Sequence, residues 1–249
     1  MEKIESLEGK SVAIVGLGKS WHDYNLAKSH GVHFDEVWAI NGVGSVIYHD
    51  RTFMMDPPGR FLDTDDAGGQ TDGVTQILLN GENPIYTCML DDRCKNLIEY
   101  PINEILEEFN CCYINNTVAY AIAFALWNKV STLKMFGIDF SYKGNLHFAE
   151  SGRACCEFWL SKAMHLGVKV EVAKTSALLD TDVIAEERLY GYHRLEDPLV
   201  TMSDGKGFMT SMKRSEAMAM QEQEKEQEPI LIDRNDSHLE PKIGEPKKW

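Results

Sequence analysis

The sequence predicts an α/β fold in which helices cover both faces of a doubly wound, mostly parallel sheet. Short apolar runs rich in β-branched residues alternate with helical segments, as they do in chains of βαβ units. The first run, Ser11 to Val15, ends in the glycine-rich turn Gly16 to Ser20, and a helix-like stretch, Trp21 to His30, follows. The chain has 249 residues, of which 43% are hydrophobic, so it can bury the core of one such domain.

Further strands are predicted by the same signals, since short apolar runs stop at or near Gly, Pro, Asn or Asp residues. These runs are Glu36 to Ile40, Thr52 to Met55, Pro84 to Thr87, Cys112 to Ile114, Leu133 to Phe136 and Val168 to Val172. Residues 60–73 are rich in Asp, Gly and Thr, which predicts a loop. The run at residues 168–172 is expected to be the last strand.

Helical segments lie between these strands. Pro101 to Phe109 has helical periodicity with a proline at the first helical position, and Val118 to Asn128 is apolar and alanine-rich. Ser151 to Leu166 is a third segment, which stops at Gly167. Together with the strands, these helices predict a nucleotide-binding domain over residues 1–200.

Residues 201–249 are expected to form an acidic tail. Gln, Glu, Lys and Met dominate from about Ser203 onward, and Pro229, Pro241 and Pro246 interrupt any long helix. The tail is therefore predicted to be largely disordered, apart from a solvated helix over Met218 to Gln227.

Charge and composition limit the classes of partner. The formal net charge of −14 disfavours nucleic acid, and no apolar run approaches the ~18 residues of a membrane span. The charged start, Met1 to Glu5, does not resemble a signal peptide, so the cytoplasm is the expected location. The six cysteines have no C-x-x-C spacing and are predicted to be small buried thiols. Neither a metal site nor a cofactor is predicted.

Polar residues gather at the carboxyl ends of the predicted strands, where doubly wound sheets bind ligands. In the turn Gly16-Leu17-Gly18-Lys19-Ser20, two glycines let the backbone approach a phosphate, and the next helix offers free N–H groups. The spacing matches neither G-x-x-x-x-G-K-[ST] nor G-x-G-x-x-G. The turn is therefore a candidate phosphate site, and the alternative is a tight turn that binds nothing.

Two later strand ends also carry candidate groups. Asn115-Asn116-Thr117 precedes the apolar helix, where these residues cap the helix, contact an anion or ribose, or do both. The polar segment after Gly137-Ile138-Asp139-Phe140 holds Tyr142 and His147. A polar loop at a strand end suits an acid/base pair, so His147 is a candidate base, and the alternative is a solvated histidine.

The sequence resembles the bacterial sialyltransferases of glycosyltransferase family 42 and the related DUF115 group. In that family a small polar pair begins an Ala-rich helix, as Asn116-Thr117 does in the segment Asn116 to Leu126. A strand that ends in Gly-Ile-Asp-Phe follows, as in the segment Lys134 to Phe140. His147 and the pair Glu157-Phe158 reproduce the spacing between a family histidine and a Glu-Phe pair. The resemblance covers about residues 11–180, and residues 144–159 also look like uncharacterised bacteriophage proteins.

This resemblance implies a Rossmann-like fold that binds a cytidine nucleotide-sugar without an essential metal. It implies that His147 is the general base on the acceptor hydroxyl and that Tyr142 stabilises the departing phosphate. From the strand ends and the resemblance together, the candidate nucleotide-binding residues are Gly16, Gly18, Lys19, Ser20, Asn41, Asn116, Thr117 and Asp139.

Some positions depart from the family pattern. Leu17 stands where the family has a nucleotide-contacting Asn, and Lys19 stands where it has Pro. The family has two tyrosines around the loop, and here only Tyr142 is present. The donor is therefore a CMP-sugar or, if Lys19 serves a diphosphate, a UDP- or GDP-linked sugar or a pyrophosphoryl substrate.

The predicted function is that of a nucleotide-sugar-dependent glycosyltransferase whose acceptor is a glycan or a hydroxymethylated base of phage DNA. One alternative is a DUF115-like diphosphokinase, which would need Mg²⁺ at Asp56 or Asp139. Another is a non-enzymatic nucleotide-binding or phage–host interaction protein, located in the host cytoplasm if phage-encoded. The sequence leaves open the donor, the acceptor and the oligomeric state, a homo-oligomer included.

Overall fold

The chain divides into two compact units, Met1–Arg188 and Leu189–Trp249. The predicted domains over residues 1–200 and 201–249 stay a prediction, and the two compact units meet at residue 188. The structure, a computed structural model, describes residues 1–65, 67–141, 144–184, 187–191, 197, 199–203 and 209–227.

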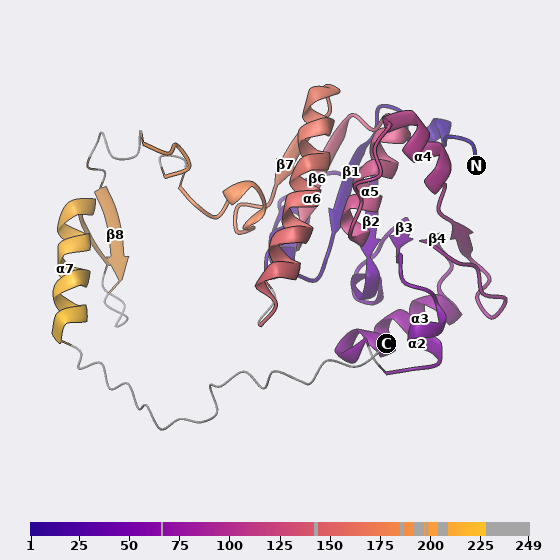
Figure 1. Cartoon of the computed structure of the whole chain (residues 1–249), viewed down its shortest axis with the longest axis horizontal. Helices are drawn as coiled ribbons and strands as arrows, with labels where there is room; N and C mark the ends of the chain where they lie inside the picture. Colours follow the sequence, from indigo (N-terminus) through magenta and orange to yellow (C-terminus); the bar gives the residue numbers. More distant parts are fainter. Residues whose placement is uncertain are drawn as a thin grey trace, which may run out of the picture. The chain divides into compact units, whose positions relative to one another are not determined.

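The first unit is built on a parallel sheet of seven strands in the order β5-β4-β3-β2-β1-β6-β7 (Figure 1). The strands are β1 (Ser11–Val15), β2 (Glu36–Ile40), β3 (Arg51–Phe53), β4 (Ile85–Thr87), β5 (Leu97–Glu99), β6 (Thr132–Phe136) and β7 (Lys169–Val172). Strands β1 to β5 extend the sheet in one direction, and β6 returns to the other side of β1. The predicted Rossmann-like, doubly wound α/β fold is confirmed.

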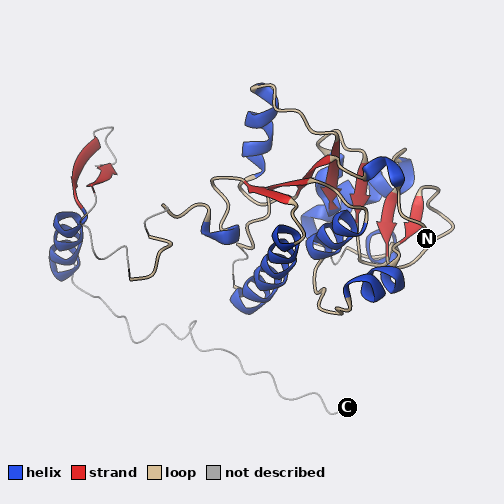
Figure 2. Cartoon of the chain, turned by 90° about the horizontal axis from the view of Figure 1, so that it is seen from above, coloured by secondary structure: helices blue, strands red, loops and turns tan. Residues whose placement is uncertain are grey.

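Helices cover both faces of this sheet (Figure 2). They are α1 (Trp21–Ser29), α2 (Gly59–Leu62), α3 (Thr71–Asn80), α4 (Ile102–Phe109), α5 (Thr117–Trp127) and α6 (Leu146–His165). The residues of β1 alternate between the two faces, because successive side chains of a strand point in opposite directions. Val12 and Ile14 pack in the larger core with α5 and α6, whereas Ala13 and Val15 pack in the smaller core beside Tyr24 of α1.

Helix α5 lies at the centre of the larger core. Its residues from Val118 to Trp127 are almost all buried, which agrees with its uniformly apolar sequence. The Phe124 ring contacts the rings of Trp38, Phe53 and Tyr86 from three neighbouring strands. This packing fixes the position of the N-terminus of α5 relative to the carboxyl edge of the sheet.

Several predicted elements differ from the structure. Residues 112–114 form no strand, and residues 60–73, predicted as a loop, contain part of α2 and the first turn of α3. Strand β5, which the sequence analysis missed, is short and only partly buried. Cys94, Cys155 and Cys156 are buried as predicted, but Cys88 and Cys112 are exposed.

The second unit contains an antiparallel pair, β8 (Leu199–Ser203) and β9 (Met209–Lys213), followed by α7 (Arg214–Gln227). Residue 172 is therefore not the end of the last strand, and part of the predicted tail has regular structure. The Asp197 carboxylate accepts hydrogen bonds from the Ser215 N–H and hydroxyl at the start of α7, at 2.8 and 2.6 Å. Residues 228–249 of the predicted tail lie outside the described residues.

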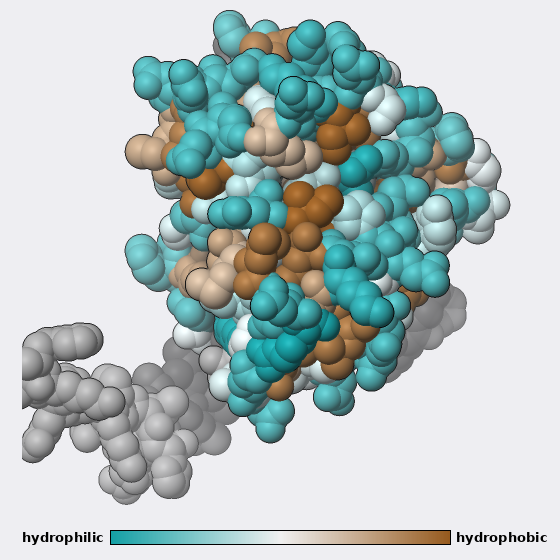
Figure 3. Space-filling view, turned by 90° about the vertical axis from the view of Figure 1, so that its right-hand side faces the viewer, coloured by the Kyte–Doolittle hydropathy of each residue, from teal (hydrophilic) through white to brown (hydrophobic). Residues whose placement is uncertain are grey.

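Hydrophilic side chains make up much of one face of the molecule (Figure 3). Figure 3 shows one face on which hydrophilic side chains surround separate apolar patches. Over the described part of the chain, no helix is both long enough and apolar enough to cross a membrane.

Candidate functional site

A cleft of about 620 Å³ lies at the carboxyl ends of β2 and β3, beside α2 and the N-terminal turns of α5 and α6. This volume is within the range of about 300–1,000 Å³ that small-molecule sites occupy. Its lining residues are Ile40, Asn41, Met55, Asp56, Arg60, Phe61, Ala67, Gln70, Ile114, Asn115, Asn116, Thr117, Val118, Tyr120, Phe140, Phe148, Ser151 and Gly152. The position agrees with the rule that open α/β sheets bind ligands at their carboxyl edge.

Asn41 occupies an unusual position in the wall of this cleft. It follows the last residue of β2 with a left-handed backbone (φ 51°), a conformation that asparagine tolerates better than most residues. Its side-chain oxygen Oδ1 is buried and has no hydrogen-bond partner among the described residues. An unsatisfied buried acceptor costs about 1–3 kcal/mol, so an N–H or O–H donor on a ligand would stabilise this arrangement.

Asn116 caps helix α5 with its side chain. Its Oδ1 accepts hydrogen bonds from the Ala119 N–H at 3.0 Å and from the Cys156 thiol at 3.3 Å. Its Nδ2 donates to Asn115 Oδ1 at 2.9 Å and to the Gly152 carbonyl at 3.1 Å. Both ends of this amide are therefore used within the protein, and Asn116 positions the N-terminus of α5 against α6.

Thr117 is the first residue of α5, and it lines the cleft. The N-terminus of a helix carries partial positive charge and unpaired N–H groups, which together favour an anion. The structure thus brings Asn41, Asn116 and Thr117 of the predicted nucleotide site to one cleft. The Asn116 side chain forms its hydrogen bonds within the protein.

Aromatic residues form another wall of the cleft. Phe140 has a left-handed backbone (φ 47°), and its ring packs against Gly152 of α6. A Cβ atom at Gly152 would lie 2.7 Å from Phe140 Cε1, so only glycine leaves room for the ring. Burial raises the pKa of the nearby Tyr120 hydroxyl, which therefore remains a neutral hydrogen-bonding group.

The glycine-rich turn after β1 does not line this cleft. It packs instead against the end of β6, where the Gly18 N–H donates to the Gly137 carbonyl at 2.8 Å. The Asp139 carboxylate accepts a hydrogen bond from the Ser20 N–H at 2.7 Å, and both residues are buried. Cβ atoms at Gly16 and Gly18 would lie 2.6 and 2.7 Å from the same Gly137 oxygen.

Asp139 thus occupies the N-terminus of α1, the place that the sequence analysis gave to a phosphate. A second anion there would be repelled by the carboxylate. Phosphate binding by Gly16, Gly18 and Ser20 stays a prediction, and this geometry does not favour it. The sequence could not show this arrangement, because no local pattern reveals that the Asp139 side chain, three residues after the end of β6, fills the turn after β1.

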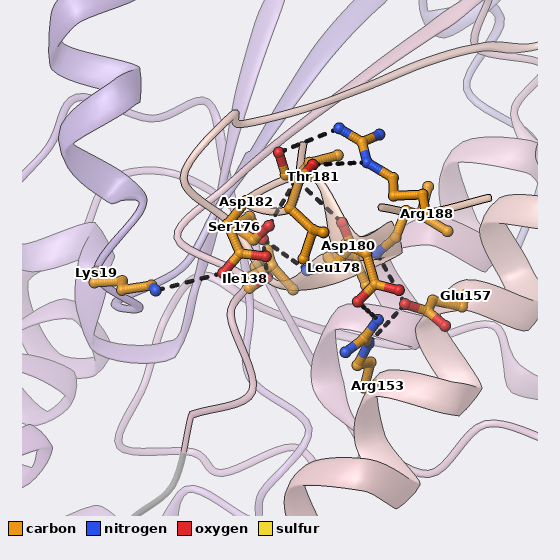
Figure 4. A network of polar contacts seen from close by, with 12 residues as sticks. Lys19, Ile138, Arg153, Glu157, Ser176, Leu178, Asp180, Thr181, Asp182 and Arg188 are labelled. Carbon is orange, nitrogen blue, oxygen red and sulfur yellow. Dashed lines mark hydrogen bonds and ion pairs between the residues drawn. The ribbon is translucent and has the colours of Figure 1, made fainter. Parts of the chain in front are cut away.

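Lys19 is also engaged away from the cleft. Its Nζ lies 3.7 Å from the Asp182 carboxylate, in the loop that follows β7 (Figure 4). This loop is held by a polar network in which Arg153 of α6 binds Glu157 and Asp180 at 2.8 and 2.6 Å. The Ser176 hydroxyl donates to the Ile138 carbonyl at 2.7 Å. Lys19 therefore belongs to the contacts that join this loop to the carboxyl edge of the sheet.

His147 lies in the first turn of α6, not in a loop, because the helix begins at Leu146 rather than at the predicted Ser151. Asn145 caps the helix by accepting a hydrogen bond from the Phe148 N–H at 3.2 Å. His147 is exposed and precedes Ser151 by one helical turn, which places the two side chains on the same helix face. Ser151 lines the cleft, whereas His147 is not among its lining residues. Tyr142 is outside the described residues.

The two candidate magnesium ligands are in different places. Asp56 lines the cleft, where it pairs with Arg60, whereas Asp139 is buried in the glycine-rich turn. Within the described ranges, no group of three or more His, Cys, Asp and Glu residues could hold a metal ion.

Several lining residues were not anticipated from the sequence. Arg60 and Phe61 belong to a helix of four residues that was predicted as a loop, and such a short element has no periodic signal. Gly152 and Phe148 lie in the first turns of α6, whose cap at Asn145 was interpreted as part of a loop. The clearest available signal was Asn145 itself, since asparagine is a preferred cap residue.

No family model matches the chain, and no curated protein matches it. A solved structure of the sialyltransferase CstII from Campylobacter jejuni with CMP-3FNeuAc, described as a substrate analogue, matches at 18% identity and a TM-score of 0.46. The match covers 68% of this chain and 83% of that one. An α-2,3-sialyltransferase from Campylobacter jejuni in apo form matches at 16% identity and a TM-score of 0.42, over 71% and 82% of the two chains.

Proposed function

We propose that the cleft binds a nucleotide-sugar and that the protein transfers the sugar to an acceptor hydroxyl. The observation that carries this proposal is the buried, unpartnered Asn41 Oδ1 in the wall of a cleft that also contains the N-terminus of α5. Asn41 offers a polar contact for a base or ribose, and Thr117 and the helix N-terminus offer a contact for phosphate. The walls at Phe140 and Tyr120 suit a planar base.

In the proposed reaction, His147 acts as general base. Its neutral imidazole takes the proton of the acceptor hydroxyl while the acceptor oxygen bonds to the anomeric carbon of the sugar. The bond between that carbon and the phosphate oxygen breaks, and the phosphate leaves with the electron pair. His147 is exposed and lies one helical turn before the cleft residue Ser151, so it is accessible to an acceptor.

The sequence resemblance to glycosyltransferase family 42 supports the choice of a nucleotide-sugar over a free nucleotide. Of the alternatives, the diphosphokinase reaction would require Mg²⁺. Of its two candidate ligands, Asp56 lines the cleft and Asp139 does not. A non-enzymatic nucleotide-binding protein would use the same cleft without turnover. Donor hydrolysis or transfer measured with and without EDTA distinguishes these reactions, because the proposed transfer does not depend on a metal.

Nucleotide binding is tested first, with a thermal-shift screen against CMP, CDP, UDP, GDP and ADP. A ligand that binds only the native state raises the melting temperature. The decisive variant is Asn41→Gly, which keeps the left-handed backbone and removes the side chain. Its matched control is Asn110→Gly, because Asn110 is also left-handed (φ 44°) but ends α4 outside the cleft.

The proposal expects Asn41→Gly to weaken nucleotide binding by about tenfold, the effect of one lost hydrogen bond, while Asn110→Gly binds like the wild type. Equal affinities of the two variants, or no shift with any of the five nucleotides, would contradict the proposed site.

A further inference from the structure

Two side-chain amides and a hydroxyl form a chain of hydrogen bonds beside the N-terminus of α5. Asn116 Nδ2 donates to Asn115 Oδ1 at 2.9 Å, and Asn115 Nδ2 donates to the hydroxyl oxygen of Ser151, Oγ, at 2.9 Å. All three residues line the cleft, and the chain of bonds joins the segment before α5 to α6. It therefore ends on a hydroxyl at the wall of the cleft.

Backbone groups fix the direction of these hydrogen bonds. The Ala119 N–H can only donate, so the oxygen of the Asn116 amide faces it, at 3.0 Å. The Gly152 carbonyl can only accept, so the nitrogen of the same amide faces it, at 3.1 Å. The Ser151 carbonyl likewise accepts from Asn115 Nδ2 at 3.2 Å. Reversing either amide would place two acceptors or two donors against each other.

This direction decides what the Ser151 hydroxyl can do. A serine hydroxyl has one proton to donate, and its oxygen can also accept hydrogen bonds. Because Oγ accepts from Asn115, the proton is not used in that bond, and no described residue of the chain accepts it. Ser151 is partly buried in the cleft wall, so its hydroxyl offers a hydrogen bond to an acceptor that enters the cleft.

A phosphate matches this donor better than a ribose does. Ionised phosphate oxygens only accept hydrogen bonds, and bonds to charged acceptors are the stronger ones. The bond from Asn116 to the Gly152 carbonyl holds the N-terminus of α5, whose partial positive charge favours an anion, next to Ser151. The bond that Oγ accepts from Asn115 also polarises the hydroxyl and strengthens it as a donor.

We propose that Ser151 donates a hydrogen bond to the nucleotide phosphate and that Asn115 positions the hydroxyl for this contact. The inference rests on the proposed function, because it concerns the same cleft and the same ligand. It adds a side-chain donor for the phosphate to the backbone groups of the α5 N-terminus. In the proposed reaction, this donor also stabilises the negative charge that the phosphate gains as its bond to the sugar breaks.

The test compares a nucleotide with the nucleoside that lacks the phosphate. Binding of CMP and cytidine, and of UDP and uridine, is measured by calorimetry for the wild type, Ser151→Ala and Ser161→Ala. Ser161 is the matched control, because it is a serine of the same helix that is exposed and does not line the cleft. Alanine is a better helix former than serine, so α6 should tolerate both changes, and the melting temperatures check this.

Ser151→Ala is expected to weaken nucleotide binding about tenfold, the low end for a hydrogen bond to a charged group, because the site is partly exposed. Binding of the nucleoside should change less than twofold, and Ser161→Ala should change neither affinity.

A double-mutant cycle tests the positioning role of Asn115. Asn115→Ala leaves the hydroxyl of Ser151 in place but removes the bond that orients it, so nucleotide binding should weaken about threefold. The double variant should lose no more affinity than Ser151→Ala alone, because Asn115 acts through the hydroxyl. Additive losses, or a loss in Asn115→Ala that is equal for nucleotide and nucleoside, would contradict this role.

Two results would overturn the inference while leaving the proposed function in place. One is wild-type nucleotide affinity in Ser151→Ala, and the other is an equal loss for nucleotide and nucleoside in that variant. If the wild-type chain bound neither CMP nor UDP, the proposed function would fail first, and this inference would fail with it.

Discussion

Gly18→Ala tests whether Asp139 fills the turn after β1. The added Cβ would lie 2.4 Å from Asp139 Oδ2 and 2.7 Å from the Gly137 carbonyl oxygen. Both are closer than real Cβ atoms come to their neighbours, and neither atom is at the end of a flexible, exposed side chain. The backbone of Gly18 has no positive φ, so any effect comes from lost space and not from a forbidden conformation.

The expected loss of stability has two parts. Overpacking a filled site costs about 1–3 kcal/mol. Movement of Asp139 away from the Cβ also weakens its hydrogen bond from the Ser20 N–H, and hydrogen bonds to charged groups contribute about 1.5–3 kcal/mol. Because partial relaxation reduces both parts, we expect a total of about 2–4 kcal/mol.

Equilibrium unfolding in urea measures this loss, together with the melting temperature. For a unit of this size, each kcal/mol lowers the melting temperature by about 2–4 °C, so Gly18→Ala should melt at least about 4 °C below the wild type. Gly69→Ala is the matched control, because a Cβ at Gly69 meets nothing within 4 Å and the backbone has no positive φ. Its stability should stay within about 0.5 kcal/mol of the wild type.

Coupling to Asp139 separates a local clash from a general effect. In the double variant Gly18→Ala with Asp139→Ala, the closest contact is absent, so the combined loss should be smaller than the sum of the two single losses. A wild-type stability of Gly18→Ala, or strict additivity with Asp139→Ala, would refute the claim that the carboxylate occupies this turn.

The remaining predictions concern the site and the two units. Lys19→Ala should change nucleotide affinity less than twofold, because Lys19 pairs with Asp182 and does not line the cleft. A tenfold loss of affinity, measured by calorimetry, would instead indicate that the glycine-rich turn binds the phosphate. His147→Ala should lower turnover by about 10² to 10⁴ with little change in nucleotide affinity, whereas His165→Ala, at the other end of α6, should be fully active; equal activities would remove the catalytic role of His147. A chain that ends at Arg188 should keep the melting temperature of the first unit within a few degrees, since the two units are separately compact, and a collapse of stability would contradict that division.

The sheet was predictable because its central strands are buried on both faces. Such strands, for example Ser11–Val15, appear as short apolar runs rich in β-branched residues and end at glycine or asparagine. Strand Leu97–Glu99 has three partly exposed residues, too few for any period to be recognised. The start of α6 was placed too late because Asn145 caps a first turn whose polar and exposed residues resemble a loop.

The candidate site was predictable only in part, for a different reason. The strand-end rule found Asn41 and Thr117, because it depends on topology, and topology followed from the strand pattern. The sequence did not indicate that the hydrogen bonds of Asn116 are used internally, or that Arg60 faces the same cleft. Both depend on contacts between segments far apart in the chain, such as the bond from Asn116 Nδ2 to the Gly152 carbonyl.

The carboxyl edge of the sheet contains two helix N-termini that differ in what they leave for a ligand. At α1, the buried Asp139 carboxylate already accepts a hydrogen bond from the Ser20 N–H, so the partial positive charge of that helix is already compensated in part. At α5, the cap residue Asn116 is neutral and uses its side chain internally, which leaves the helix charge uncompensated at a cleft. An anionic ligand therefore gains more electrostatic stabilisation at α5 than at α1, although α1 follows the glycine-rich turn. This difference is the physical reason to place the nucleotide phosphate in the cleft.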